Sequence, residues 1–200
     1  MTTYSHTSIS VSMKTNVNAA LRPTLWRTCR ALANPKRLAV LRWLSIHGER
    51  DVSAVAQAMS WPLSLTSEAL RMLNARGLLS VRRSGRHVCY RVGTDRSLPE
   101  SALLLKAVVK LLGQSGSSSD DICKILTGVT HPRRQQILQL LRRQMRFGEL
   151  KARTRISAAA LCRHLGKLRA RGLVERSRDR YRLAWPGDPL RQALLELADR

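Results

Sequence analysis

Basic side chains gather around two short turns of the chain, and their chemistry suits the binding of phosphate. One turn is formed by Ser84 and Gly85, and the other lies near Asp179. The surrounding basic residues are Arg82, Arg83, Arg86 and His87 at the first turn and Arg176, Arg178, Arg180 and Arg182 at the second. Basic hairpin tips are suited to phosphate contact or to the minor groove of DNA. We therefore expect both turns to bind a nucleic-acid backbone, with a solubilising role as the alternative.

The residues that usually carry catalysis or hold metals are not arranged for either role. The four cysteines are widely scattered and form no C-x-x-C pair; they are Cys29, Cys89, Cys123 and Cys162. This pattern predicts free thiols in a reducing cytoplasm and no bound metal. The sequence also has no G-x-S-x-G, P-loop, H-E-x-x-H or dinucleotide-binding glycine motif. We expect a protein that is not an enzyme and that needs no cofactor.

The net charge indicates an anionic partner. The 200 residues include 36 Lys and Arg against 13 Asp and Glu, a formal charge of +23. Both halves are basic, with 15 basic and 5 acidic residues in 1–100 and 21 basic and 8 acidic residues in 101–200. The usual partner of so basic a chain is nucleic acid. Because only 4% of the residues are aromatic, duplex DNA is favoured over a single strand stacked on exposed rings.

The apolar segments and the first residues of the sequence predict the cellular compartment. Hydrophobic residues make up 44% of the chain, which is enough for a core, but no run of about 18 apolar residues occurs. The first twenty residues have neither the basic start nor the apolar stretch of a signal peptide. We expect residues 1–20 to form a disordered polar tail. The protein should lie in the cytoplasm, without a membrane partner.

The sequence contains an internal repeat. LANPKRLAVLRWL at 32–44 matches VTHPRRQQILQLL at 129–141, LNARGLL at 73–79 matches LRARGLV at 168–174, and YRV at 90–92 matches YRL at 181–183. The offset falls from 97 to 95 to 91 residues along the chain. The decrease means that the second copy lacks two residues in an early turn and four in the last hairpin. Loops are where a duplicated fold tolerates deletions.

Each copy predicts the same order of elements. A polar residue followed by proline begins the first helix, with Asn34 in one copy and His131 in the other. A short helix and then a longer helix follow, the longer ones being expected at 62–76 and 158–171. Each longer helix ends at a glycine, after which the period changes to two. That change predicts a β-hairpin in each copy.

The order of these motifs resembles the ArsR/SmtB family of bacterial winged-helix repressors. The resemblance covers residues 25–92 and 122–184, most clearly in ERDVSAVAQAM and SEALRMLNARGLLSVRRSGRHVCYRV of the first copy and RFGELKARTRISAAALCRHLGKLRARGLVER of the second. It implies a mainly α fold with small β-hairpin wings, in other words a tandem winged helix-turn-helix. It also implies a bacterial protein associated with the nucleoid. We expect a first domain at 21–112, a Gly/Ser linker at 113–119 and a second domain at 120–200.

In the resembled family the longer helix lies in the major groove of DNA. In this chain the family's base-facing positions of the second copy hold Ser157, Ala158, Cys162, Arg163 and His164, with Lys167 one turn beyond Arg163. Arg163 is the candidate for reading guanine, because its guanidinium matches the two acceptors of that base. The alternatives are a solvated face for Arg163 and Lys167 and a packed, neutral ring for His164.

The first copy departs from this pattern. Leu63 and Leu65 replace polar residues, and Glu68 stands where the second copy has Arg163. A carboxylate repels phosphate, although it can accept a hydrogen bond from the cytosine amine. The remaining candidates for DNA contact are Ser64, Ser67 and Arg71. Because exposed leucines are costly in water, the alternative is that Leu63 and Leu65 dock a protein partner.

Metal sensing, a well-known activity of the family, is not expected. Metal-sensing members carry a cysteine pair in the segment matched by ERDVSAVAQAM, where this chain has Asp51 and Ser53. The family's other metal site uses Asp and His on the last helix, and residues 97–114 contain no histidine. Without thiolate or imidazole ligands, tight binding of zinc or arsenite is not predicted.

Residues 99–112 predict a helix that is apolar nearly all round and polar only at Lys106 and Lys110. Such a helix must be buried from several sides. Its expected interface residues are Leu104, Leu105, Val108 and Leu112. In the resembled family the first and last helices form a dimer interface, so the chain forms either a homodimer or an intramolecular pseudo-dimer. The short linker favours the pseudo-dimer.

Together these observations favour a sequence-specific, double-stranded-DNA-binding transcriptional regulator, a repressor that does not sense metal. The alternative is a non-specific DNA-binding architectural or adaptor protein whose first copy docks a protein partner. The tryptophans are expected in the core or at interfaces; they are Trp26, Trp43, Trp61 and Trp185.

Overall fold

A computed structural model describes residues 24–94, 99–114 and 116–198 as two copies of one winged-helix unit, so the tail predicted at 1–20 lies outside the described residues. The first copy contains α2 (Leu25–Leu32), α3 (Pro35–His47), β1 (Arg50–Asp51), α4 (Val52–Met59), α5 (Leu63–Asn74), β2 (Leu79–Ser84), β3 (His87–Val92) and α6 (Pro99–Leu112). The second contains α7 (Ser119–Leu126), α8 (Pro132–Leu140), β4 (Met145–Arg146), α9 (Phe147–Thr154), α10 (Ala158–Ala170), β5 (Val174–Ser177), β6 (Arg180–Leu183) and α11 (Pro189–Ala198). The two copies thus match element for element.

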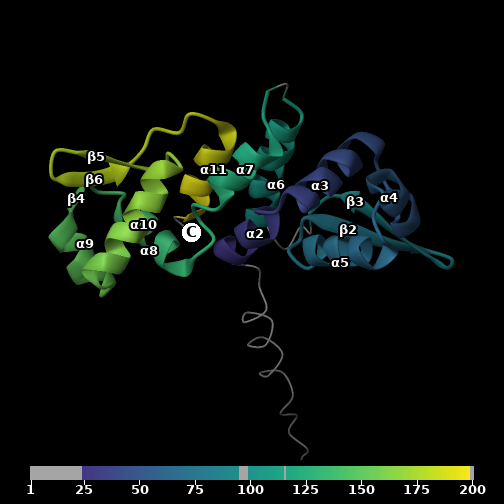
Figure 1. The fold of residues 1–200 in the computed structure, drawn as a ribbon, viewed down its shortest axis with the longest axis horizontal. Coiled ribbons are helices and arrows are strands. Elements are labelled where there is room, and N and C mark those ends of the chain that lie inside the picture. The colour runs from purple at the N-terminus through teal and green to yellow at the C-terminus, as the bar shows by residue number, and fades with distance from the viewer. Residues whose placement is uncertain (1–23, 95–98, 115, 199–200) are drawn as a thin grey trace, which may run out of the picture.

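Each copy carries a small antiparallel sheet whose hairpin forms the wing. The strand orders are β1-β3-β2 and β4-β6-β5, so the topology is the same in both copies. Tyr90 of β3 and Tyr181 of β6, the central strands of the two sheets, are buried. The wings lie at opposite ends of the long axis of the molecule (Figure 1). The predicted fold class, a mainly helical tandem winged helix-turn-helix, is confirmed.

The helices begin and end where the local chemistry predicts. At the start of α3 the Asn34 side chain accepts a hydrogen bond from the Arg37 backbone N–H at 3.1 Å. At the start of α8 the Nδ1 atom of His131 accepts one from the Arg133 N–H at 3.0 Å. Proline, which has no N–H to lose, occupies the first turn of both helices. These caps satisfy backbone donors that have no partner within the helix.

The longer helices, α5 and α10, are slightly shorter than the sequence predicts. After each of them the chain turns through a glycine with positive φ, 66° at Gly77 and 67° at Gly172. Glycine adopts this left-handed conformation without the steric cost of a side chain. The two-residue strands β1 and β4 were not predicted, because two residues are too few to show an alternating pattern.

An equivalent arginine ties the first two helices together in each copy. Arg37 donates from Nε to the Ala31 carbonyl, and Arg134 donates from Nε to the Gly128 carbonyl at 2.6 Å. Arg134 also donates from Nη2 to the Thr127 carbonyl at 3.0 Å and is itself buried. Carbonyl groups at the end of a helix lack partners within it, and these guanidinium groups supply them.

A single hydrophobic core runs through both copies. Its buried side chains extend from Leu25 in α2 to Ala198 in α11 and include Leu104, Leu105, Val108 and Leu112 of α6. α6 packs against α11 and α7, and α2 packs against α7. The predicted interface residues of α6 are therefore buried within the chain. Among the described helices, none is long and apolar enough to cross a membrane.

This shared core leads to a test of cooperativity. Leu104 is 1% exposed, so Leu104→Ala should lower the free energy of unfolding by about 2–5 kcal/mol. Because α6 packs on helices of the second copy, we expect one unfolding transition for the whole chain, shifted to lower denaturant concentration. Circular dichroism during denaturant titration measures the shift, with Val81→Ala, at a side chain 46% exposed, as the control. Two separate transitions, only one of them shifted, would contradict a shared core.

Candidate nucleic-acid interface

Helix α10 presents one buried face and one exposed face. Leu161, Leu165 and Leu168 are buried, because they recur at helical spacing toward the core. The opposite face is exposed and holds Ala158, Cys162, Arg163 and Lys167. Arg163 and Lys167 are four residues apart and therefore neighbours on the helix surface. Partial burial, with Arg134 and Arg171 nearby, lowers the pKa of the Lys167 amine.

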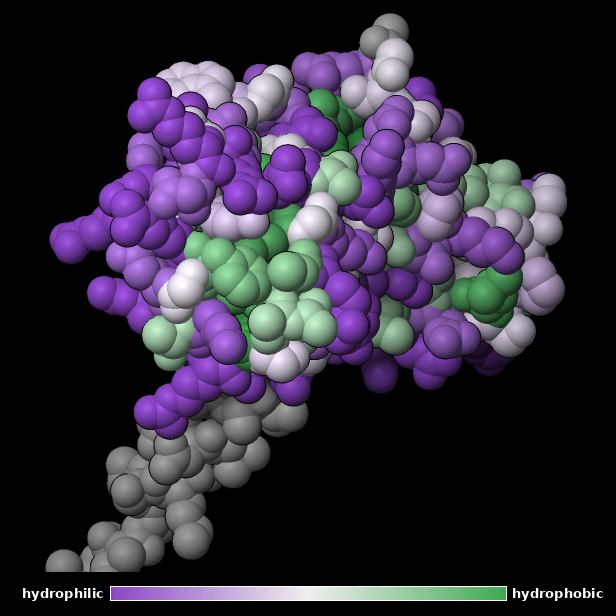
Figure 2. Space-filling view, turned by 60° about the vertical axis from the view of Figure 1, so that its left-hand side comes forward, coloured by the Kyte–Doolittle hydropathy of each residue, from purple (hydrophilic) through white to green (hydrophobic). Residues whose placement is uncertain are grey.

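The start of α10 is built for close approach of another molecule. Ser157 is the N-cap, and its hydroxyl accepts a hydrogen bond from the Ala160 N–H at 3.4 Å. The first turn carries only alanines, with Ala158 and Ala159 exposed. Small side chains leave the backbone N–H groups accessible, and the N-terminus of a helix attracts phosphate. In Figure 2, which turns the second copy toward the viewer, hydrophilic side chains surround a patch of weakly hydrophobic ones.

The second wing places four arginines beside α10, but two of them have local partners. Arg182 donates from Nε to Glu175 at 2.5 Å. Arg176 donates from Nε to the Arg178 carbonyl at 3.0 Å, and its guanidinium lies 5.6 Å from the centre of the Tyr181 ring. Arg178 and Arg180 are exposed at the tip of the hairpin, without an ion-pair partner among the described residues.

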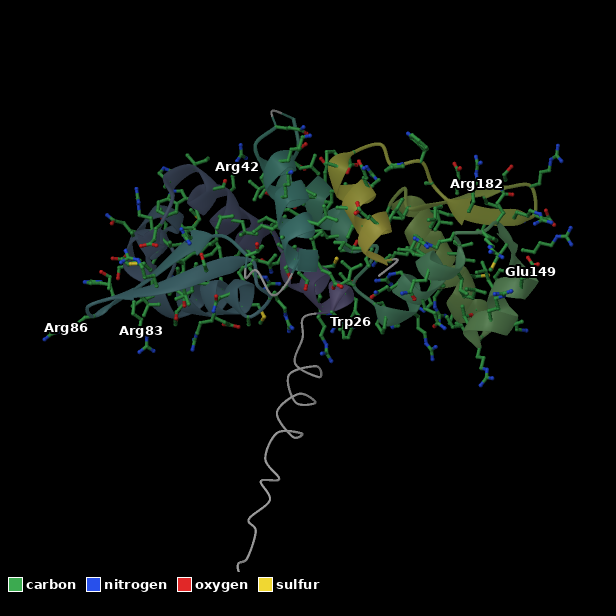
Figure 3. The ribbon with its side chains drawn as sticks, turned by 180° about the vertical axis from the view of Figure 1, so that it is seen from behind. Trp26, Arg42, Arg83, Arg86, Glu149 and Arg182 are labelled. Carbon is green, nitrogen blue, oxygen red and sulfur yellow. The ribbon has the colours of Figure 1, made fainter. Side chains whose placement is uncertain are left out.

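The first wing has the same design. Arg82 is paired with Glu49 at 2.5 Å, and the hydrogen bond from Arg82 lowers the pKa of the Glu49 carboxyl. His87 lies 3.6 Å from Asp51, measured from Nδ1 to Oδ2. Arg83 and Arg86 are exposed. In Figure 3 both lie at the tip of the wing, whereas Arg42 lies on the other edge of the same copy.

Helix α5 occupies the place of α10 in the first copy, yet its surface differs. Ser64 and Arg71 are exposed and Ser67 is half-buried; the Arg71 Nε donates to the Ser67 carbonyl at 3.3 Å. Leu63 is 55% exposed, as the sequence suggested. Leu65 is instead half-buried and lines a small hollow beside Trp61. Of the two leucines predicted to dock a protein partner, only Leu63 is therefore fully available at the surface.

Two histidines meet between α10 and the start of α8. The ring centres of His131 and His164 are 4.9 Å apart, and His164 is half-buried. Burial lowers the pKa of His164, and His131, Arg134 and Arg163 are among the neighbours that lower it further. Burial likewise lowers the pKa of His131, followed by the charges of Arg134, Arg30 and Arg133. In the first copy the matching positions hold Asn34 and Ala69.

Several residues of this surface were not predicted from the sequence. Glu49, Asp51 and Arg146 lie in or beside the short strands β1 and β4 and pair with wing residues, Arg146 with Asp179 at 2.7 Å. The register of β1 and β4 brings them there, and those strands are too short to recognise in a sequence. Trp185 does not lie in the core, since it is 90% exposed, and its place at an interface stays a prediction. Among the described residues, no three His, Cys, Asp or Glu side chains gather in a way that could hold a metal.

Comparisons with known proteins match parts of the chain. A model of the MarR family matches residues 127–181. The HTH-type transcriptional regulator Rv0324 of Mycobacterium tuberculosis is 40% identical over 77 residues, which are 38% of this chain and 34% of that protein. The chain thus spans about a third of the length of this curated relative.

Two solved structures from Mycobacterium bovis also match, both of fragments comprising residues 1–100. One is a crystal structure of a possible transcriptional regulatory protein, 34% identical, covering 44% of this chain and 89% of that one, with a TM-score of 0.36. The other is a solution structure of a homodimeric winged helix-turn-helix DNA-binding domain described as a possible ArsR-family regulator. It is 31% identical, covering 48% of this chain and 86% of that one, with a TM-score of 0.35.

The histidine pair predicts how stability depends on pH. Both pKa values are lower in the folded chain, so below about pH 6.5 the unfolded chain binds more protons and stability falls. The double variant His131→Asn and His164→Ala installs the residues of the first copy. We expect its unfolding midpoint to fall less than that of the wild type between about pH 7.5 and about pH 5. Denaturant midpoints across this range measure the difference, and parallel curves for the two proteins would refute it.

Proposed function

We propose that this chain, a winged helix-turn-helix protein of the MarR/ArsR-like type, is a sequence-specific repressor that binds double-stranded DNA and does not sense metal. The observation that carries the proposal is the exposed cationic face of α10 beside the basic wing of the same copy. A helix that enters the major groove needs base-reading side chains on its outer face and phosphate contacts around it. The curated relative Rv0324 is described as an HTH-type transcriptional regulator, which agrees with a regulatory function and not with an enzyme.

Arg163 is the base-reading residue in this proposal. Its guanidinium can donate two hydrogen bonds to guanine, which distinguishes that base from the other three. Lys167, one turn further along, contacts the same edge of the groove or the phosphates beside it. Ala158 and Cys162 offer small apolar surface to the bases, and the capped first turn at Ser157 faces a phosphate. His164 supports α10 from its place against His131 and lies at the margin of the contact.

The two wings supply contacts that do not depend on sequence. In the second wing Arg178 and Arg180 bind phosphate directly, while Arg176 and Arg182 shape the hairpin through their local partners and add positive potential. In the first wing Arg83 and Arg86 have the direct role, with Arg82 and His87 behind them. Helix α5 adds contacts from Ser64, Ser67 and Arg71. Such contacts fix the position of the protein on the duplex.

Repression requires no surface beyond the one described, because a bound protein blocks access to the DNA beneath it. The place of a metal-binding cysteine pair in the resembled family is held here by Asp51 and Ser53. Asp51 is used locally, since its carboxylate accepts a hydrogen bond from the Ala54 N–H at 2.7 Å and caps α4. These residue types support a regulator whose effector is not a metal ion.

A second candidate function is supported by Leu63, which is exposed at the start of α5, and by Glu68 on the same helix. In that case the second copy holds DNA without sequence preference, and the first copy docks a protein. The variant Leu63→Ser separates the two functions. It should release a protein partner and leave DNA affinity unchanged if α5 is a docking helix.

Selection of duplexes from a random pool at about 0.15 M salt tests the proposal, since salt weakens purely electrostatic binding through counterion release. We expect an enriched motif. Arg163→Ala should reduce binding to that motif about tenfold to hundredfold and relax the preference at one base pair, as the loss of a bidentate base contact does. Arg42→Ala, which removes the same charge away from the wings, is the matched control. No enriched motif, with equal affinity for all sequences, would favour the architectural function.

The second wing leads to a prediction about salt. The double variant Arg178→Ala and Arg180→Ala removes two phosphate contacts, so affinity should fall by a similar factor for every sequence. The slope of the logarithm of affinity against the logarithm of salt concentration should become shallower by about 2, roughly one for each lost contact. Fluorescence anisotropy over a salt series measures both quantities. An unchanged slope would mean that the wing does not touch the DNA.

A further inference from the structure

We propose that this protein binds DNA as a monomer, and that its DNA site is asymmetric, with two unlike half-sites. The inference rests on the proposed function and names the kind of DNA that the surface fits. Winged-helix regulators that act as homodimers present two identical reading helices, so their half-sites mirror one another. This chain provides both reading helices itself, α5 from the first copy and α10 from the second, and the two helices differ in sequence.

The packing between the two copies has the form of a dimer interface. Two pairs of equivalent elements touch each other across it, α2 on α7 and α6 on α11, and α3 and α6 also pack on α7. Contact between the same surface of two like units is the mark of a two-fold, self-complementary interface. Arg30 extends the contact, because its Nη2 donates to the Thr130 carbonyl at 3.3 Å, in the segment before α8. The chain therefore has the arrangement of a homodimer within one polypeptide.

The surfaces that would join a second chain are already occupied. The inner sides of α6 and α11 are buried, with Val108 and Leu194 fully so. The remaining exposed large hydrophobic side chains among the described residues are distributed over α3, α5, β2 and the segment after β6. They are Ile46, Leu63, Met72, Val81 and Trp185. None of them lies on α2, α6, α7 or α11, so the packing of these four helices leaves no large apolar side chain exposed for a second chain.

The two reading helices differ at every outward position that could face a base. The repeat places residues of α5 and α10 in register with an offset of 95. The pairs are Leu63 with Ala158, Ser67 with Cys162, Glu68 with Arg163, Arg71 with Gly166, and Met72 with Lys167. Apart from Ser67, which is half-buried, all of these residues are exposed.

The chemistry of these pairs assigns different bases to the two half-sites. Arg163 donates to guanine, whereas a carboxylate such as Glu68 accepts from the cytosine amine and repels phosphate. Met72 can make apolar contact only, where Lys167 carries a charge. A palindrome would therefore satisfy one helix and mismatch the other. The half-site under α10 is read strongly, and the half-site under α5 is read weakly or by shape.

The test uses the full chain and duplexes selected from a random pool. Native mass spectrometry and sedimentation should give one chain per duplex, and the enriched motif should lack two-fold symmetry. Replacing the half-site read by α10 should cost about tenfold or more in affinity beyond the cost of replacing the other half-site. Two chains on a palindromic motif would overturn the inference and leave the proposed function standing. Absence of any motif would overturn both.

A second variant makes α5 resemble α10. Glu68→Arg with Met72→Lys should raise affinity about tenfold for an inverted repeat of the half-site read by α10, because both helices can then donate to guanine. Glu68→Gln with Met72→Gln removes the carboxylate without adding a matched reader and is the control. Both variants change exposed positions. Thermal unfolding of each variant checks that it folds. An equal gain from both variants, or a gain from neither, would overturn the assignment of unlike half-sites.

Discussion

The packing of α6 against α11 is the contact on which the rest of the structure depends. α6 is apolar nearly all round, so it cannot remain in water, and the second copy provides the surface that covers it. Once these helices meet, α2 reaches α7 and the two cores become one. The same contact fixes where the two wings lie, at opposite ends of the molecule. A charge of +23 on 200 residues opposes compaction by self-repulsion, and this shared core holds the chain together against it.

Much of the fold could be predicted from the sequence, because its signals are local. Pro35 and Pro132 mark the starts of α3 and α8, and Gly77 and Gly172, both with positive φ, follow the ends of α5 and α10. The alternation around Tyr90 and Tyr181 predicts the two hairpins. Leu104 and its neighbours in α6 are buried, as a helix without a polar face must be. The sequence left open whether a second chain or the second copy covers α6, and in the structure α11 of the second copy packs on it.

The parts that were not predicted depend on contacts between distant residues. Arg82 reaches Glu49 across 33 positions, and Arg146 reaches Asp179, because two-residue strands set their register. The pairing of His131 with His164 depends on how α10 crosses α8. Trp185 is exposed although tryptophan is usually largely buried, and nothing in the structure explains its exposure. These contacts separate the arginines that pair within a wing from those that point outward. Composition alone cannot separate the two groups.

Binding of one chain to two half-sites requires that both wings and both reading helices face one duplex. A hydroxyl-radical footprint of the full chain on its selected duplex, at one chain per duplex, measures this most directly. We predict two protected segments on one face of the DNA, with centres about 10 base pairs apart, roughly one helical turn. The segment under α10 should be protected more strongly than the segment under α5. A single short protected segment per chain would contradict binding by both copies, because one of them would then lie away from the DNA.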